Sequence, residues 1–297
     1  MIFNFTRRDQ LTFNFAAEKA GAGINYLKIN YAVPNEFFTP VSHLPQAKFI
    51  RGQTPYNFSR DSRGKPRLAF DDLPSSYPPV LAEEEAWTFE QIALLHDISQ
   101  VLFEKGELVE GNYCFTNDKV PTPFMPIDPR RAAKRNLLRE FCKNKIFVLE
   151  IGFNAGHSSL LVLSSNSITR ILAIDIEEHI YSKDCSSILE KAYPERFNVM
   201  WGDSRILLWS LDSKLISEID LVHIDGGHSI DIFSNDLNWC IKNVSIGTTL
   251  FVDDAYNQHI LELLLELETN NYIKLLCHNE NQTQEVRVYE LVKNAMK

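Results

Sequence analysis

The sequence has no uninterrupted apolar stretch long enough to span a membrane or to form the core of a secretion signal. Cysteine is also scarce: the five residues are widely scattered and never spaced as C-x-x-C, at Cys114, Cys142, Cys185, Cys240 and Cys277. This pattern indicates neither a disulfide framework nor a zinc site. We therefore expect a cytoplasmic protein with reduced thiols.

Basic residues are fewer than acidic residues in this chain. The 297 residues include 30 lysines and arginines against 39 aspartates and glutamates, which gives a formal net charge of -9. This balance argues against a general binder of nucleic acids or anionic membranes, so we expect a small-molecule partner, no nucleic acid and no membrane. The hydrophobic fraction of 44% is sufficient for one large or two modest globular domains.

A recurrent pattern is present in the second half of the chain, where short apolar runs end in an acidic residue. The acids are Glu150, Asp175, Asp203, Asp225 and Asp253. The intervals between them, each about 22 to 28 residues, have room for one strand, one helix and their loops. This alternation predicts an α/β protein with a doubly wound, mostly parallel sheet. The carboxylates would then meet at one sheet edge, where such sheets bind ligands.

The two ends of the chain depart from this alternation. Two strands at 272–277 and 285–291 are too close together for a crossover helix, so we expect an antiparallel hairpin at the sheet edge. For the N-terminal region we expect a mixed α+β structure, with a hairpin at 56–60 and 66–70. A helix should run from Thr88, which forms a capping-box pattern with Gln91, to about Gly106.

Residues 110–128 are rich in proline and aromatic residues and predict a loop of the kind that covers active sites. A helix should follow, with Asp128 as its N-cap and Pro129 at its first position. Its basic residues are Arg130, Arg131, Lys134, Arg135 and Arg139. We interpret them as a solvated helix face, and the alternative is a site for an anion or a partner.

The stretch from Phe147 to Ser159, FVLEIGFNAGHSS, joins a predicted strand to a glycine-bearing turn and a helix start. Gly152 and Gly156 permit a tight turn and the close approach of a ligand. Ser158 or Ser159 could cap a helix whose free N–H groups face an anionic ligand.

Two residues of this stretch narrow its interpretation. Asn154 stands where the dinucleotide fingerprint G-x-G-x-x-G has its second glycine, so that fingerprint is incomplete. Glu150 lies in an otherwise apolar run, and a carboxylate there is costly to bury unless it is paired or meets a ligand.

Three aspartates follow neighbouring predicted strands: Asp225, Asp253 and Asp254. Their carboxylates would repel one another unless a cation joined them, and hard oxygen ligands favour Mg²⁺, Mn²⁺ or Ca²⁺. Alternatively, one of the adjacent pair only caps the following helix. His228 follows Asp225 after two glycines, and its imidazole could accept a proton from a hydroxyl; a structural role is the alternative.

Two motifs, EIGFNAGHSS and HIDGGHS followed by VDD, resemble the class I S-adenosylmethionine-dependent methyltransferases. Within that class they are similar to the metal-dependent O-methyltransferases that act on sugar hydroxyls of macrolide and aminocoumarin antibiotics. The resemblance covers residues from about 145 to 297. It implies a Rossmann-like seven-stranded sheet, with a methyltransferase domain at 128–297. Residues 1–127 would serve as a lid, for substrate recognition or for homo-oligomerisation.

The resemblance also implies residue roles. The expected cofactor-binding residues are Glu150, Gly152, Asn154, Gly156, Ser158, Asp175, Asp203 and Ser204. The first four would shape the pocket for the methionine part, with Ser158 near its carboxylate. Asp175 would hold the ribose hydroxyls. Asp203 and Ser204 would lie beside the adenine, although Asp203 could instead be a turn or cap residue.

The same resemblance implies Mg²⁺ or another divalent cation at Asp225, Asp253 and Asp254, with His228 as the catalytic base. Many relatives have Glu-Asp where this chain has Asp253-Asp254. Of the other histidines, His223 is expected in the core, whereas His157 could line the donor pocket or only belong to the loop.

We therefore expect methyl transfer from S-adenosylmethionine to a hydroxyl of a small molecule, such as a natural product or a sugar. One alternative is a nicotinamide-dependent oxidoreductase, against which the missing glycine and the C-terminal hairpin both count. Another is a non-catalytic binding protein with the same fold.

Overall fold

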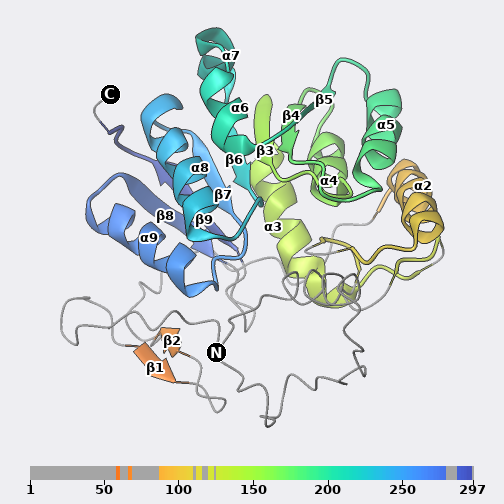
Figure 1. The fold of residues 1–297 in the computed structure, drawn as a ribbon, viewed down its shortest axis with the longest axis horizontal. Helices are drawn as coiled ribbons and strands as arrows, with labels where there is room; N and C mark the ends of the chain where they lie inside the picture. Colours follow the sequence, from red (N-terminus) through yellow and green to blue (C-terminus); the bar gives the residue numbers. More distant parts are fainter. Residues whose placement is uncertain are drawn as a thin grey trace, which may run out of the picture. The chain divides into compact units, whose positions relative to one another are not determined.

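Seven strands form one sheet in the order β5-β4-β3-β6-β7-β9-β8 (Figure 1). The computed structural model describes residues 58–60, 66–68, 87–109, 112–115, 120–123, 125–278 and 286–295. The strands of the sheet are β3 (Phe147–Ile151), β4 (Arg170–Asp175), β5 (Phe197–Trp201), β6 (Leu221–Ile224), β7 (Thr249–Val252), β8 (Ile273–His278) and β9 (Arg287–Leu291). Strands β3 to β7 pair in parallel, and β9 pairs antiparallel with both β7 and β8. The predicted sheet and its C-terminal hairpin are thus confirmed.

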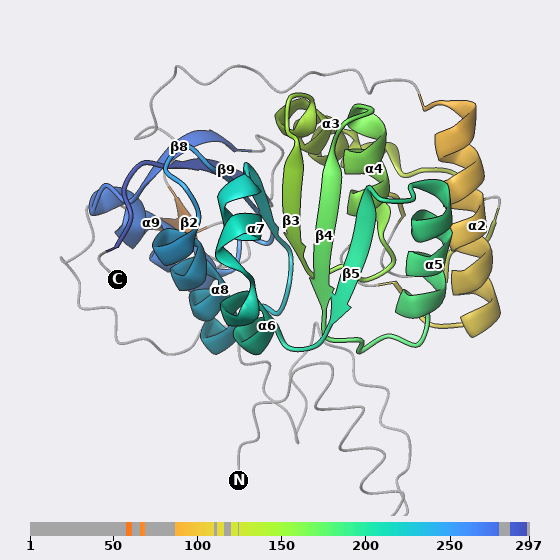
Figure 2. The ribbon, with the colours of Figure 1, turned by 90° about the horizontal axis from the view of Figure 1, so that it is seen from above.

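Helices cover both faces of this sheet (Figure 2). They are α2 (Phe89–Lys105), the 3-10 helix η2 (Pro129–Arg131), α3 (Ala132–Cys142), α4 (His157–Ser165), α5 (Ser182–Ala192), α6 (Ser204–Ser210), α7 (Ser213–Glu218), α8 (Ile230–Asn243) and α9 (Gln258–Thr269). Helices α2 to α5 contribute to one apolar core and helices α6 to α9 to the other, while the strands contribute residues to both. Neither α6 nor α7 was predicted from the sequence, because both helices are too short to show a clear periodicity of apolar residues.

Strand residues alternate between the two cores. Val148 packs with the α3–α4 side, whereas Leu149 and Ile151 pack with the α8–α9 side. This period of two places Glu150 on the same face as Val148. The register pairs Glu150 with His223 of the neighbouring strand β6. Both polar side chains therefore point toward the helices α3 and α4.

The chain forms two compact units, residues 1–73 and 74–297. In the first, β1 (Phe58–Arg60) and β2 (Pro66–Leu68) pair antiparallel, as the sequence predicted. In the second, α2 begins at the predicted capping box, in which Thr88 N donates to Gln91 Oε1 at 2.8 Å. Helix α2 packs against α4 and α5, beside the sheet. The functional division into 1–127 and 128–297 stays a prediction.

The prediction of a solvated basic face after residue 128 is wrong for three of its residues. Lys134, Arg135 and Arg139 are buried. Lys134 precedes Leu137 and Leu138 by three and four residues, and helical periodicity therefore places it on their apolar face. Arg135 Nη1 donates to the carbonyl oxygens of Tyr113 (2.8 Å) and Asp128 (3.0 Å). These buried cations attach α3 to the segment that precedes it.

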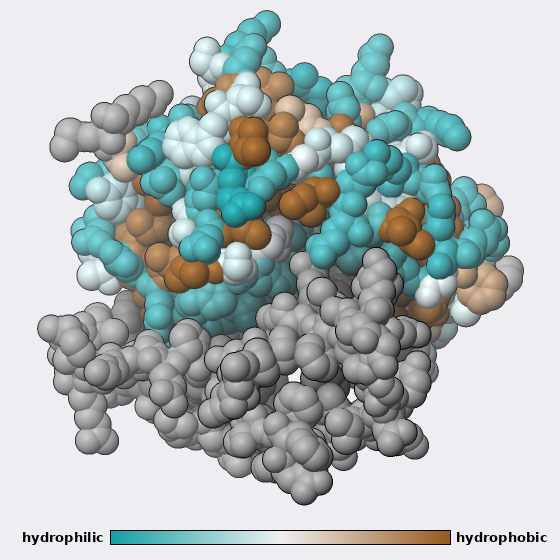
Figure 3. All heavy atoms as spheres, viewed as in Figure 1, coloured by the Kyte–Doolittle hydropathy of each residue, from teal (hydrophilic) through white to brown (hydrophobic). Residues whose placement is uncertain are grey.

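The surface of the described residues is mixed in character. On the face drawn in Figure 3, apolar side chains form several separate groups among polar ones. Exposed apolar residues such as Ile206, Trp209 and Ile230 come from two different helices, α6 and α8. No helix within the described ranges is both long and apolar enough to cross a membrane.

Candidate functional site

The loop between β3 and α4 has left-handed backbone at Gly152 (φ 94°), Asn154 (φ 52°) and Gly156 (φ 78°). A side chain at position 152 would place Cβ 2.1 Å from the carbonyl oxygen of Asp225, so only glycine fits this close approach. Asparagine tolerates the left-handed region, and Asn154 Oδ1 accepts a hydrogen bond from the Tyr181 hydroxyl at 2.6 Å. Asn154 therefore takes a backbone conformation that glycine adopts in other loops.

The predicted serine cap of the next helix is wrong. Helix α4 begins at His157, with Gly156 in the N-cap position and no side-chain cap. Ser159 instead donates its hydroxyl to Glu150 Oε2. Because no side chain caps α4, its first N–H groups remain suited to an anionic ligand.

Asp175, at the end of β4, fixes the shape of the β3–α4 loop. Its Oδ2 accepts hydrogen bonds from the backbone N–H groups of Phe153 and Asn154, both at 2.9 Å. Its Oδ1 accepts the N–H of Glu177 at 2.7 Å. The structure thus brings Asp175 together with the predicted cofactor loop, and its role toward a ribose stays a prediction.

Asp203 and Ser204 follow the edge strand β5. Asp203 caps α6 through the N–H of Arg205 at 2.9 Å, which was the alternative role considered for it. Hydrogen bonds from the Arg205 guanidinium hold the pKa of Asp203 below its usual value. Ser204 hydrogen-bonds the buried Asp236, whose pKa burial raises to about 6. Their adenine contact stays a prediction.

A narrow cavity lies at the carboxyl end of β3 and β6. Its lining residues are Asn112, Tyr113, Gly152, Phe153, Asn154, Ala155, His157, Ser158 and Asp225. Residues predicted to bind the methyl donor and one predicted metal ligand, Asp225, therefore line the same cavity. Asn112 and Tyr113 belong to the segment that was predicted to cover the site. A larger, apolar cavity of about 580 Å³ is lined by α2 and by residues around Phe115 and Met125.

His157 lies in the wall of the narrow cavity and is 3% exposed. Neither ring nitrogen has a hydrogen-bond partner within the described residues. Burial lowers the pKa of His157 to about 3, so the ring is neutral and offers one donor and one acceptor. The Phe115 ring packs edge-on against it, at 5.5 Å between centroids. His157 therefore lines the narrow cavity, and its contact with a methyl donor stays a prediction.

Glu150 is paired within the protein. His223 Nδ1 lies 3.1 Å from Glu150 Oε1, and the Tyr113 hydroxyl lies 2.9 Å from His223 Nε2. His223 is fully buried, as predicted, but it also links polar groups. These bonds explain how a carboxylate is retained in the sheet core. Whether Glu150 also meets the cofactor stays a prediction.

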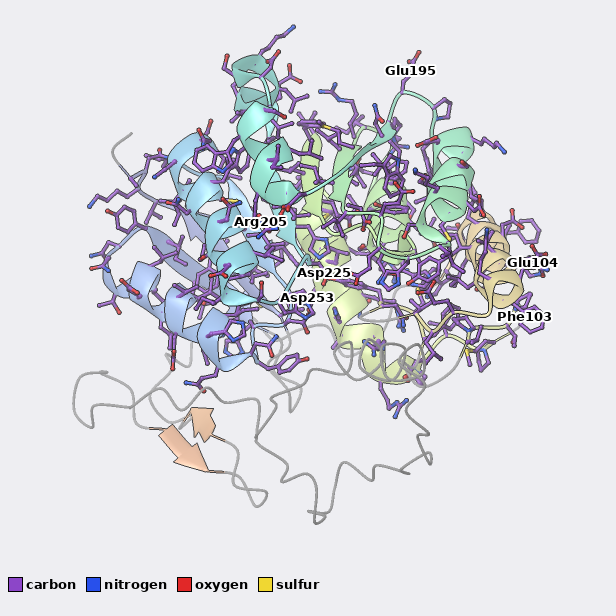
Figure 4. The ribbon with its side chains drawn as sticks, in the orientation of Figure 1. Phe103, Glu104, Glu195, Arg205, Asp225 and Asp253 are labelled. Carbon is purple, nitrogen blue, oxygen red and sulfur yellow. The ribbon has the colours of Figure 1, made fainter. Side chains whose placement is uncertain are left out.

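The three predicted aspartates lie together at the ends of β6 and β7; Figure 4 labels Asp225 and Asp253. Possible ligand atoms of His223, Asp225 and Asp253 lie within 4.8 Å of one another, as do those of Asp225, His228 and Asp254. Burial raises the pKa of Asp225 well above its usual value, and Asp253 adds to this effect. The cluster therefore needs positive charge to keep all three carboxylates ionised.

Part of that charge comes from a residue that the sequence analysis placed in solvent. Lys134 Nζ lies 2.5 Å from Asp253 Oδ2, and the two side chains are 2% and 1% exposed. The sequence held a signal for this position, since Lys134 shares the helical face of Leu137 and Leu138. Only the structure shows that this face meets Asp253.

His228 lies at the open side of the cluster, with a side chain that is 51% exposed. Its Nε2 lies 2.5 Å from Asp254 Oδ2. Burial alone would raise the pKa of Asp254, but the hydrogen bond and charge of His228 hold this pKa below its usual value. The carboxylate orients the imidazole, as in other paired acid–histidine sites.

The residues present fit a hard divalent cation. The ligand atoms are carboxylate oxygens that converge from two adjacent strands. Burial and then the neighbouring acids raise the pKa of Asp225. Such oxygen-rich sets suit Mg²⁺, Mn²⁺ or Ca²⁺ better than softer metals.

Comparison with known proteins agrees with the observed fold. Residues 149–255 match the model of a family described as a methyltransferase domain. No curated protein matches the sequence. The O-methyltransferase TomG from Streptomyces achromogenes, involved in tomaymycin synthesis and solved with S-adenosylmethionine (SAM), is 17% identical, with a TM-score of 0.50 over 68% of this chain and 90% of its own. An O-methyltransferase from Bacillus cereus, solved with SAH, is 14% identical, with a TM-score of 0.52 over 68% of this chain and 91% of its own.

At these identities the solved structures show the fold alone. Residues 149–255 match a methyltransferase domain, and the strand order is that of the class I methyltransferase fold. This is the class that the motifs at Glu150 and Asp225 predicted, so the predicted class of fold and enzyme is confirmed.

Proposed function

We propose that this methyltransferase moves a methyl group from SAM to a hydroxyl oxygen of a small molecule, with the help of a divalent cation. The acceptor would be a natural product or a sugar, as the motifs suggest. The observation that supports this best concerns Asp225. It lines the narrow cavity with Gly152 and Asn154, and it also belongs to the acidic cluster.

The residues around the cavity suit a methyl donor such as SAM, which has a charged amino-acid end. The uncapped start of α4 and the neutral ring of His157 offer hydrogen-bond donors there. Asp175 holds the loop that forms the cavity wall, through two backbone N–H groups. In this proposal the loop orients the sulfonium, which supplies an electrophilic methyl group.

His228 would act as the base. In the neutral tautomer with its hydrogen on Nε2, the ring would donate to Asp254 Oδ2 and take the acceptor's hydroxyl proton on Nδ1. A divalent cation at the aspartates would supply positive charge that makes this hydroxyl more acidic. Asp254 stabilises the imidazolium that forms, and the acceptor oxygen attacks the methyl group in line with the departing sulfur. Much of the rate enhancement should come from holding the two reactants in this geometry.

Isothermal titration calorimetry tests the proposal on the full chain. SAM and NAD are titrated with and without Mg²⁺, into wild type, Asp225→Asn and the exposed control Asp97→Asn. We expect SAM to bind wild type and the control, NAD to bind neither, and Mg²⁺ to bind Asp225→Asn more weakly. Binding of NAD without binding of SAM would favour the oxidoreductase alternative instead. SAM binding without turnover on any hydroxyl acceptor would favour the non-catalytic alternative.

A further inference from the structure

The acidic cluster contains a buried cation of its own. Lys134 Nζ lies 2.5 Å from Asp253 Oδ2 and 4.3 Å from the centroid of the Tyr113 ring. A buried ammonium is costly unless it is paired, so the contact with Asp253 is a requirement for keeping Lys134 charged in this position. Helix α3 is itself fixed in place, because Arg135 binds the backbone of Tyr113 and Asp128.

Asp253 is engaged on both of its oxygens. Oδ2 contacts Lys134, and Oδ1 accepts the backbone N–H of Asp254 at 2.9 Å. Asp254 has a left-handed backbone (φ 51°), which the bond from its N–H to Asp253 helps to hold. Asp253 therefore stabilises the conformation that directs the Asp254 carboxylate toward His228.

The other two aspartates also lie together. Ligand atoms of Asp225, Asp254 and His228 lie within 4.8 Å of one another. Asp225 is equally close to Asp253 and His223, but in that second group Asp253 is already engaged by Lys134. Three carboxylates and one ammonium leave two negative charges in the cluster. One divalent cation would neutralise them.

We infer that Lys134 is a built-in cation of the cluster that pairs with Asp253. A divalent ion would therefore be bound by the carboxylates of Asp225 and Asp254. The inference rests on the proposed function, in which the sequence motifs implied three aspartate ligands. Asp253 becomes a positioning residue that acts through Asp254, and Lys134 sets the charge that the ion meets.

Binding of Mn²⁺ to the full chain, followed by electron paramagnetic resonance without SAM, tests this assignment. Asp225→Asn should lose Mn²⁺ affinity by about tenfold or more, because a ligand charge is removed. Asp253→Asn should lose much less, about twofold to threefold. Lys134→Met should tighten Mn²⁺ binding by about tenfold, because Asp253 is released and a positive charge is removed.

Lys105→Met is the matched control. It removes a lysine that pairs with Asp184 at 2.7 Å on the surface between α2 and α5, so the net charge changes equally. Mn²⁺ affinity should not change in this variant. Unchanged or weaker binding in Lys134→Met, or a loss in Asp253→Asn equal to that in Asp225→Asn, would overturn the inference.

Unfolding in urea with EDTA provides a second measurement, since Lys134→Met leaves a buried carboxylate unpaired. The double variant Lys134→Met/Asp253→Asn should be more stable than Lys134→Met, whereas additive losses would refute the pairing. Absence of Mn²⁺ binding in wild type would overturn the inference and the metal part of the proposed function. SAM binding in the same protein would then still support the transferase.

Discussion

Glu150 and His223 face each other across the neighbouring strands β3 and β6, with His223 Nδ1 3.1 Å from Glu150 Oε1. Ser159, in the first turn of α4, binds the other oxygen of Glu150. The Tyr113 hydroxyl binds the other nitrogen of His223. A chain of buried hydrogen bonds therefore joins the start of α4 to the segment of Tyr113, and both line the narrow cavity.

Tyr113→Phe should destabilise the fold by about 1 to 3 kcal/mol, because it leaves His223 Nε2 buried without its hydroxyl partner. Urea unfolding measures the loss. Tyr272→Phe is the control, since the Tyr272 hydroxyl makes no hydrogen bond among the described residues. Equal stability of the two variants would mean that the Tyr113 hydroxyl contributes nothing.

Gly152→Ala should unfold more easily than Gly247→Ala by roughly 1 to 3 kcal/mol. The two glycines have nearly the same backbone angle, φ 94° and φ 91°, so the conformational cost of alanine is matched. Only at position 152 would the new Cβ meet the carbonyl oxygen of Asp225. The same clash should weaken SAM binding, measured by calorimetry, in Gly152→Ala alone. Retained stability and affinity in this variant would show that the loop can relax away from β6.

His228→Ala should keep its SAM affinity and lose kcat by about 10² to 10⁴, the contribution of a positioned general base. Calorimetry gives the affinity, and single-turnover methyl transfer to a hydroxyl acceptor gives the rate. His96→Ala, on the exposed side of α2, is the control. Unchanged turnover in His228→Ala would remove this histidine from the base role.

Asp236 should make stability depend on pH. Burial raises its pKa in the folded chain to about 6, from 3.8 in the unfolded chain. The neutral carboxyl is thus favoured by folding, so its contribution is fully present below about pH 4 and is lost as the pH rises through about 6. One pKa unit corresponds to about 1.4 kcal/mol, so the loss is on the order of 3 kcal/mol.

Asp236→Asn, which stays neutral, should lack this loss. Urea unfolding at several pH values compares it with wild type and with the exposed control Asp97→Asn. The stability difference between Asp236→Asn and wild type should grow between about pH 4 and pH 7 and then level off. A difference that stays constant over this range would show that Asp236 ionises normally in the folded chain.

Much of the fold could be predicted because its signals are local. Strand β6 was predicted from a short apolar run that ends just before Asp225, and α2 from the capping box at Thr88 and the glycine at 106. The short helices α6 and α7 were missed, since six or seven residues hold too little periodicity. The cap of α4 was misassigned because Ser159 found a partner in Glu150, nine residues earlier in the chain.

The sequence by itself determined the order of strands and helices and the placement of acids at strand ends, because apolar period and residue spacing act within a few residues. Tertiary structure decided which of these acids meet, and with what charge. Lys134 shows the difference: its helical face is readable from Leu137 and Leu138, but its partner Asp253 is brought there only by packing of α3 against the sheet. Burial then gives that contact its importance, because an ammonium and a carboxylate removed from water must be paired.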